Sequence, residues 1–160
     1  MRLNQIHKYN YQVGYDNIDM YSVMYHPEYL KVCDKARNKA FEDYGYPVEQ
    51  QLKDKVGFTI GGINCRYSSP ILMGEKLSVF TKCVEANKNR CKVFHYITLE
   101  TDDHVDIGDE ASKKKILFSA EYTLVLVSID KISEFPLSRQ NVKSLEVREF
   151  SEQIKDALKY

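Results

Sequence analysis

Apolar side chains recur at intervals of three and four residues in the segment 27–44, and this spacing places them on one face of a helix. The segment opens on Pro27, which the first turn of a helix tolerates, and Gly45 follows it, as is typical of a helix end. We therefore predict a one-sided helix from about Pro27 to Tyr44, the most buried helix of the protein. Its apolar positions are Leu30, Cys33, Ala36, Ala40, Phe41 and Tyr44.

Long β-prone runs dominate the chain after this helix. Turn-like stretches separate them, reading PILMGE, ANKNR and the charged DDHVDIGDEASKKK. The tyrosine-rich residues 9–15 predict a further short strand ahead of the helix, and residues 46–54 form a connection with room for one helical turn. Because the runs are long and are joined by turns, they predict an antiparallel sheet against which the helix buries its stripe, an α+β layout. The four runs are 56–68, 76–87, 91–101 and 115–129.

The tail after Pro136 carries apolar residues at helical spacing, which predicts a terminal amphipathic helix. No linker, repeat or low-complexity block interrupts the chain. We therefore expect one domain over residues 1–135, with residues 136–160 as a C-terminal extension packed on it. The apolar residues of the tail are Phe150, Ile154, Ala157 and Leu158.

Composition narrows the class of protein. A chain of 160 residues with 43% hydrophobic content can bury a core, and its 23 basic and 23 acidic residues balance. Nucleic-acid binding by bulk electrostatics is not expected, since that mode needs a basic excess. No apolar run is long enough to span a membrane, and the start lacks a signal-peptide pattern. The four cysteines form no CxxC pair, so we expect free buried thiols, no structural zinc and a cytoplasmic location.

Two stretches of the sequence form a recognisable pattern together. The first reads YDNID over residues 15–19, VMYH over 23–26, Tyr29, and DKAR over 34–37. The second reads YSSP over residues 67–70, GEKL over 74–77, and Val79. In this order, with the predicted helix between them, they resemble the hotdog-fold acyl-CoA thioesterases of the 4-hydroxybenzoyl-CoA thioesterase group. The resemblance covers roughly residues 9–130. It implies a curved antiparallel sheet of five or six strands wrapped around one long central helix.

The resemblance also implies where the chemistry lies. The catalytic carboxylate of the family falls on Asp19, as nucleophile or general base, and the backbone N–H of His26 would face the thioester carbonyl. The first turn of a helix independently suits that role, because its N–H groups lack helical partners and carry partial positive charge. One such donor is worth about 3 kcal/mol at a developing oxyanion. The His26 side chain is a second candidate, as an acid or a substrate-orienting group. By the same correspondence Tyr21, Tyr25, Ser68 and Ser69 are expected to contact the substrate.

One departure from the family pattern leaves alternatives open. The family usually has glycine two residues after the aspartate, sometimes followed by a second, and this chain has Tyr21 and Ser22. A tyrosine there would narrow the acyl pocket or change the loop path. Asp16, Asn17 and Asp19 are also ordinary turn-forming residues, and composition alone favours that interpretation.

As a whole, the resemblance implies hydrolysis of an acyl-CoA to a free acid and coenzyme A without a metal or redox cofactor. It also implies a homodimer or homotetramer with sites shared between subunits, and no nucleic-acid or membrane partner. The alternatives are an acyl-carrier-protein thioesterase, a 1,4-dihydroxy-2-naphthoyl-CoA thioesterase, or a non-catalytic acyl-thioester-binding hotdog protein. On the predicted helix, Asp34 and Arg37 are three residues apart and are expected to form an ion pair.

Overall fold

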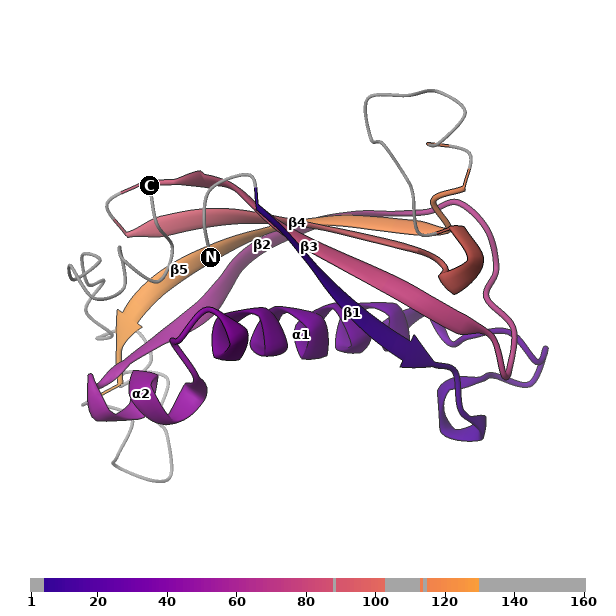
Figure 1. The fold of residues 1–160 in the computed structure, drawn as a ribbon, viewed down its shortest axis with the longest axis horizontal. Helices are drawn as coiled ribbons and strands as arrows, with labels where there is room; N and C mark the ends of the chain where they lie inside the picture. Colours follow the sequence, from indigo (N-terminus) through magenta and orange to yellow (C-terminus); the bar gives the residue numbers. More distant parts are fainter. Residues whose placement is uncertain (1–4, 88, 103–112, 114, 130–160) are drawn as a thin grey trace.

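A five-stranded antiparallel sheet curves around one long helix in the computed structural model, which describes residues 5–87, 89–102, 113 and 115–129 (Figure 1). The strand order is β1-β3-β4-β5-β2. Short 3-10 turns lie at Tyr15–Asn17 and Glu100–Asp102. The main elements are β1 (Ile6–Gln12), α1 (His26–Asp43), α2 (Val48–Lys53), β2 (Val56–Tyr67), β3 (Lys76–Ala86), β4 (Arg90–Leu99) and β5 (Phe118–Ser128).

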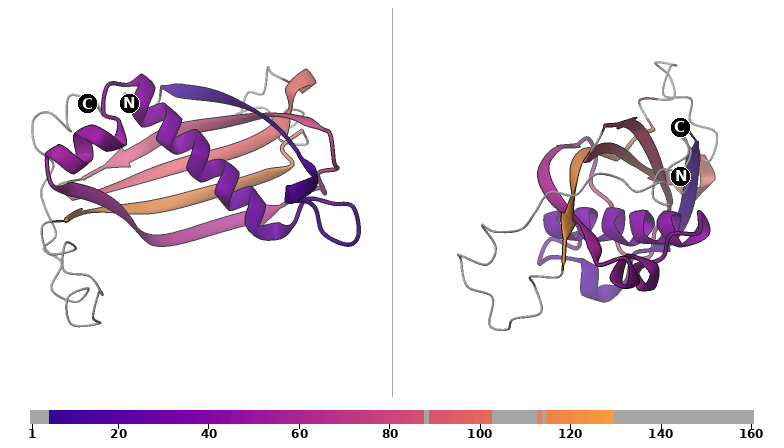
Figure 2. Two further views of the ribbon diagram at one scale, coloured as in Figure 1. Left: turned by 90° about the horizontal axis from the view of Figure 1, so that it is seen from below. Right: turned by 90° about the vertical axis from the view of Figure 1, so that its left-hand side faces the viewer.

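Helix α1 forms where the apolar stripe predicted it, one residue earlier at each end. It crosses the concave face of the sheet diagonally, and the short α2 lies beside its C-terminal end (Figure 2). The left-handed backbone of Gly45, with φ of 82°, ends the helix. The prediction that this helix buries one face is confirmed, since the buried residues are Tyr29, Val32, Cys33, Ala36, Ala40 and Phe41.

The core lies between α1 and the inner face of the sheet. Strand β5 shows the alternation most clearly, because every second residue from Phe118 to Leu126 is fully buried. The Phe41 ring of α1 stacks on Phe58 of β2 at 4.9 Å between ring centroids. The Tyr122 hydroxyl donates a hydrogen bond to the backbone oxygen of Leu30 at 3.4 Å, which ties the sheet to the helix.

Several expectations need correction or lie outside the described residues. The first strand covers Ile6–Gln12 rather than 9–15, because pairing with β3 runs from Ile6 opposite Lys82 to Gln12 opposite Lys76. Cys65 is exposed rather than buried, since it lies on the edge strand β2, whose residues from 59 onward are open to solvent. The other three thiols are free and buried as expected. The predicted C-terminal helix within 136–160 and most of the charged stretch 102–115 lie outside the described residues.

None of the helices in the described ranges is long and apolar enough to cross a membrane.

Candidate functional site

The loop between β1 and α1 folds into a tight turn that holds Asp19 at its start. The Asp19 N–H donates to the Val23 backbone oxygen at 2.9 Å, and the Ser22 N–H donates to the Asp19 backbone oxygen at 3.1 Å. Ile18 and Met24 form an isolated antiparallel bridge just outside this turn. The Asp19 side chain is half-buried, and its Oδ1 atom accepts the Tyr21 N–H at 2.7 Å. One carboxylate oxygen is therefore held by the turn.

The left-handed backbone for which the family uses glycine occurs at Ser22, one residue later than expected. Ser22 has φ of 62°, in the left-handed region that usually requires glycine, whereas Tyr21 does not have a positive φ. The position that needs glycine is thus the second one of the family pattern. The Tyr21 side chain is 77% exposed. Within this single chain the Tyr21 side chain is therefore open to solvent, where a substrate or a second subunit could reach it.

The start of α1 presents one free backbone donor. Tyr25 is the N-cap residue, and the Glu28 N–H donates back to its carbonyl oxygen at 2.8 Å. Pro27 has no N–H to offer. In the part of the chain that the structure describes, the His26 N–H has no hydrogen-bond partner. The His26 ring is exposed and packs edge-on against the Tyr25 ring, with 4.6 Å between centroids.

Asn17 joins the loop to this helix start, and its role was not predicted. The residue is only 2% exposed. Its Oδ1 accepts the Gly14 N–H at 2.8 Å and the Tyr11 hydroxyl at 2.9 Å, and its Nδ2 donates to Glu28 Oε2 at 3.2 Å. Its backbone oxygen accepts the Tyr25 N–H at 2.8 Å. Sequence reasoning identified Asn17 only as a turn-forming residue, because nothing in a polar loop signals that one side chain is buried.

Three aromatic rings from α1, β2 and β5 pack together beside the first turn of α1. Tyr29 of α1, Tyr67 of β2 and Phe118 of β5 lie with ring centroids 4.9–5.2 Å apart. The Tyr67 hydroxyl donates to the His26 backbone oxygen at 3.0 Å, and the Tyr29 hydroxyl accepts the Ile71 N–H at 3.2 Å. Burial raises the pKa of Tyr29, and the negative charges of Glu75 and Asp19 add smaller upward contributions. The Tyr29 hydroxyl is therefore held in its neutral form.

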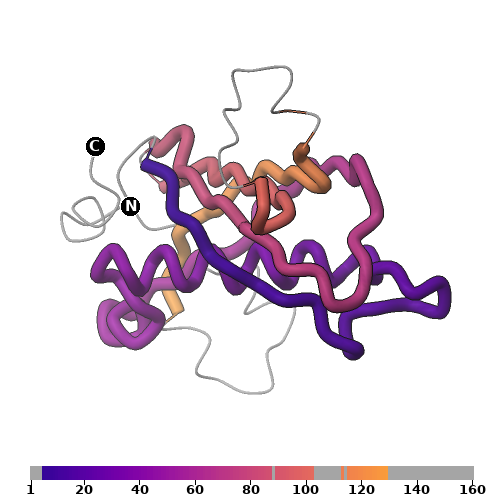
Figure 3. The backbone as a smooth tube through the Cα atoms, turned by 45° about the vertical axis from the view of Figure 1, so that its right-hand side comes forward, coloured from indigo at the N-terminus to yellow at the C-terminus, as the bar shows by residue number. Residues whose placement is uncertain are grey.

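The segment after β2 runs alongside the loop, which brings the second predicted stretch to the first (Figure 3). The Met24 N–H donates to the Ile71 backbone oxygen at 2.7 Å, and Val23 forms a bridge with Leu72. Ser68 and Ser69 are exposed, and their N–H groups both donate to the Leu117 oxygen, at 2.9 and 3.1 Å. The structure therefore gathers Asp19, Tyr21, Tyr25, His26 and both serines at one end of the molecule.

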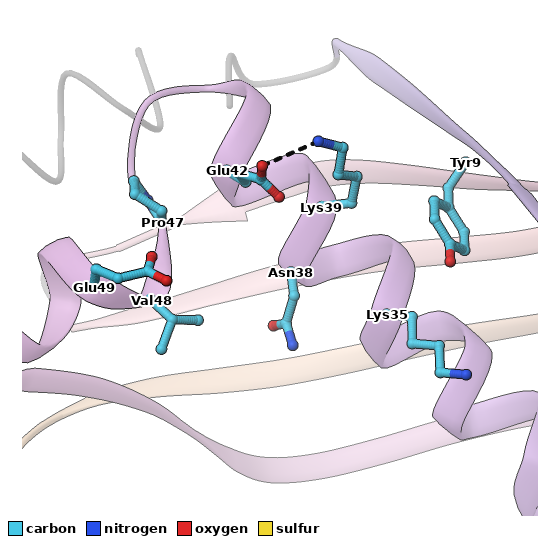
Figure 4. Close-up of a pocket in the computed structure, with 8 residues that line it drawn as sticks. All are labelled: Tyr9, Lys35, Asn38, Lys39, Glu42, Pro47, Val48 and Glu49. Carbon is cyan, nitrogen blue, oxygen red and sulfur yellow. Dashed lines mark ion pairs between the residues drawn. The ribbon is translucent and has the colours of Figure 1, made fainter.

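A separate cavity of about 670 Å³ lies along the later turns of α1 and the start of α2 (Figure 4). Lys35 follows the helix start by nine residues, so by helical rise it lies about 13 Å further along. Two lysines and two glutamates line the cavity, and Lys39 pairs with Glu42 at 3.2 Å. The formal charges of these four lining residues therefore balance. Its lining residues are Tyr9, Lys35, Asn38, Lys39, Glu42, Pro47, Val48 and Glu49.

The predicted ion pair on α1 is confirmed, with Arg37 and Asp34 joined at 2.9 Å. His95 is fully buried on β4, and its Nδ1 atom lies 3.0 Å from the Thr81 hydroxyl. Burial, together with the nearby positive charge of Arg37, lowers the pKa of His95 to about 3. The ring is therefore a neutral core group, away from the loop that carries Asp19.

Comparison with known proteins shows the family to which this chain belongs. A family model described as the thioesterase-like superfamily matches residues 13–158. The chain belongs to this thioesterase-like superfamily, and thioester hydrolysis is the activity class of that family. No curated protein matches the chain significantly.

Solved structures at low identity share the fold. One is a gentisyl-coenzyme A thioesterase at 16% identity, covering 92% of this chain and 98% of that chain, with a TM-score of 0.70. A 1,4-dihydroxy-2-naphthoyl-CoA thioesterase from Synechocystis is 16% identical, covers 87% and 93%, and has a TM-score of 0.66. A 4-hydroxybenzoyl CoA thioesterase mutant complexed with 4-hydroxybenzoyl CoA is 13% identical, covers 95% and 97%, and has a TM-score of 0.73. The predicted hotdog fold is confirmed.

Proposed function

We propose that this protein hydrolyses an acyl-CoA thioester to a free carboxylic acid and coenzyme A, with Asp19 as the catalytic carboxylate. The observation that supports the proposal is that a carboxylate and a free backbone donor occur on adjoining segments. The half-buried Asp19 side chain stands at the start of the turn, and the His26 N–H is free at the start of α1. Family membership supplies the reaction class, and three of the similar structures bear names of aryl-CoA thioesterases.

The chemistry follows from what each group can do. The His26 N–H, at the positive end of the helix, would stabilise the negative charge that develops on the thioester oxygen. Asp19 would attack the carbonyl carbon to form an acyl anhydride and release the thiolate, after which water would hydrolyse the anhydride and restore the carboxylate. Alternatively, Asp19 would take a proton from a water that attacks the thioester directly. Both routes end in the same two products. Tyr21, Tyr25, Ser68 and Ser69 remain our candidates for contacts to the substrate.

We further propose a homodimer, with a homotetramer as a larger form, in which two subunits share each site. Strand β2 supports this, because it pairs with β5 on one side only and leaves its other edge unpaired among the described residues. Its side chains are exposed from residue 59 onward, including Ile60, Ile63 and Tyr67, at 40–45% exposure. An edge strand with exposed apolar side chains favours pairing with a second copy of the chain.

Two alternatives use the same fold. The first is hydrolysis of a different thioester, either an acyl group carried on an acyl carrier protein or 1,4-dihydroxy-2-naphthoyl-CoA. The name of the similar Synechocystis structure supports testing 1,4-dihydroxy-2-naphthoyl-CoA. The second is a non-catalytic acyl-thioester-binding protein. Release of free thiol should therefore be measured across short, long and aromatic acyl-CoAs. Turnover supports the enzyme, whereas saturable binding without thiol release supports the binding protein.

The carboxylate assignment is tested by Asp19→Asn, which keeps the Oδ1 acceptor for the Tyr21 N–H and removes the charge. We expect kcat to fall by a factor on the order of a hundred or more, with little change in substrate binding. Asp16→Asn is the matched control, because Asp16 lies in the same loop and is exposed. It should stay within a few-fold of wild type. Full activity of Asp19→Asn would refute the assignment.

A further inference from the structure

The two proposed reacting groups lie on separate segments, so something must hold those segments together. Asp19 belongs to the turn before Met24, and the His26 N–H belongs to the first turn of α1. Asn17 lies two residues before Asp19, and its side-chain partner Glu28 lies two residues after His26. The hydrogen bond from Asn17 to Glu28 therefore joins two residues that flank the reacting groups in the sequence, one before Asp19 and one after His26.

The bonds of Asn17 require an amide at this position. Its Oδ1 faces two donors, the Gly14 N–H and the Tyr11 hydroxyl, whereas its Nδ2 faces a carboxylate oxygen of Glu28. An aspartate could accept from both donors but could not donate to Glu28. The side chain is almost fully buried, so each of these bonds is costly to lose.

The helix start depends on the same residue. A glutamate at the third helical position commonly reaches back to the N–H of the N-cap residue. Here the N–H of the N-cap residue Tyr25 donates instead to the Asn17 backbone oxygen, and the Glu28 carboxylate bonds to Asn17 and Lys31. Within the described residues, no side chain accepts a hydrogen bond from the His26 N–H. Asn17 thus satisfies the N-cap N–H that Glu28 would otherwise reach, while its own amide group holds the Glu28 carboxylate.

We propose that Asn17 and Glu28 are positioning residues that hold the Asp19 turn against the His26 N–H through one amide–carboxylate hydrogen bond. This inference rests on the proposed hydrolysis at Asp19 and adds the device that sets its geometry. Neither residue touches the substrate. Their contribution is the fixed separation of the carboxylate and the oxyanion donor, and a misplacement of about 1 Å at such a site can cost on the order of a hundredfold in rate.

The test reverses the direction of this bond. Asn17→Asp keeps the acceptor for Gly14 and Tyr11 but sets a carboxylate against Glu28, so kcat should fall about tenfold to a hundredfold, with a smaller change in KM. In the double variant with Glu28→Gln, the new amide can donate to the new carboxylate, and kcat should return to within a few-fold of wild type. Glu28→Ala breaks the same bond from the helix, where the Glu28 side chain is 12% exposed, and should repeat the loss. Glu42→Gln, on the same helix at the cavity of Figure 4, is the matched control and should not change kcat.

Each outcome decides one claim. A merely structural role would lower the midpoint of thermal unfolding and leave kcat per folded molecule unchanged in Asn17→Asp and Glu28→Ala. That result, or a double variant no more active than Asn17→Asp, would overturn the positioning role while the hydrolase assignment stands. If Asn17→Asp does not fold, Glu28→Ala alone decides by the same criterion. Absence of thiol release by the wild type would instead overturn the proposed function, and this inference with it.

Discussion

Replacing Ser22 by glycine should stabilise the protein, although it deletes a side chain. Ser22 has φ of 62°, and a non-glycine residue in this left-handed region is strained by roughly 1–2 kcal/mol. Glycine removes that strain but makes the unfolded chain more flexible, which costs about 0.5–1 kcal/mol. The difference predicts a net gain of roughly 0.5–1 kcal/mol in the free energy of unfolding. The exposed Ser22 side chain has little packing to lose.

Urea unfolding measures this gain as a higher midpoint at an unchanged slope. Two control variants isolate the cause. Ser22→Ala removes the hydroxyl and keeps the strain, so its stability should stay within about 0.5 kcal/mol of wild type. Tyr21→Gly places glycine one residue earlier, where the backbone does not have a positive φ, and should give no gain.

The reasoning about this turn would be refuted if Tyr21→Gly stabilised the protein and Ser22→Gly did not. The left-handed residue would then be the first glycine position of the family pattern, and the hydrogen bond from the Tyr21 N–H to Asp19 could not have the geometry described. Ser22→Gly should also keep thioesterase activity, because it leaves the Ser22 N–H bond to Asp19 in place.

Three further predictions concern the core, the response to acid and the assembly. Phe41→Ala should lower the free energy of unfolding by about 3–5 kcal/mol, since the ring is 2% exposed, and a loss under about 1 kcal/mol in denaturant would mean that the stripe faces water. His95 has its pKa lowered to about 3 from an ordinary 6.5, so its stabilising effect is fully present above pH 6.5 and is lost as pH falls towards 3. His95→Gln should therefore decrease the acid slope of the unfolding free energy by roughly 1 kcal/mol per pH unit in that window, and an unchanged slope would contradict the burial argument. Sedimentation should give a homodimer that Ile63→Asp, on β2, shifts towards the 18.7 kDa monomer, whereas a wild type that is only monomeric at micromolar concentration would rule out the shared site.

Much of the fold could be predicted from the sequence, because its signals are periodic. The spacing of apolar residues located α1 to within one residue at each end, and the β-prone runs located β2 to β5 to within a few residues. Asp19 and His26 could be paired because both belong to one local segment, where spacing along the chain reflects spacing in the fold. The shift of β1 to Ile6–Gln12 was not predicted, since an edge strand with alternating polar residues has a weak pattern and its limits are set by its partner β3.

The tertiary structure alone decided how the candidate site is held. The Tyr67 hydroxyl reaches the His26 carbonyl across 41 residues of sequence, and the Ile71 oxygen accepts the Met24 N–H. The burial of Asn17 and its bond to Glu28 likewise depend on how β1, the loop and α1 pack together. Residue type and periodicity determine which segments become helix or strand. Which polar side chain is buried between segments, and which residue of a turn takes the left-handed conformation, depends on contacts that form only when distant parts of the chain meet.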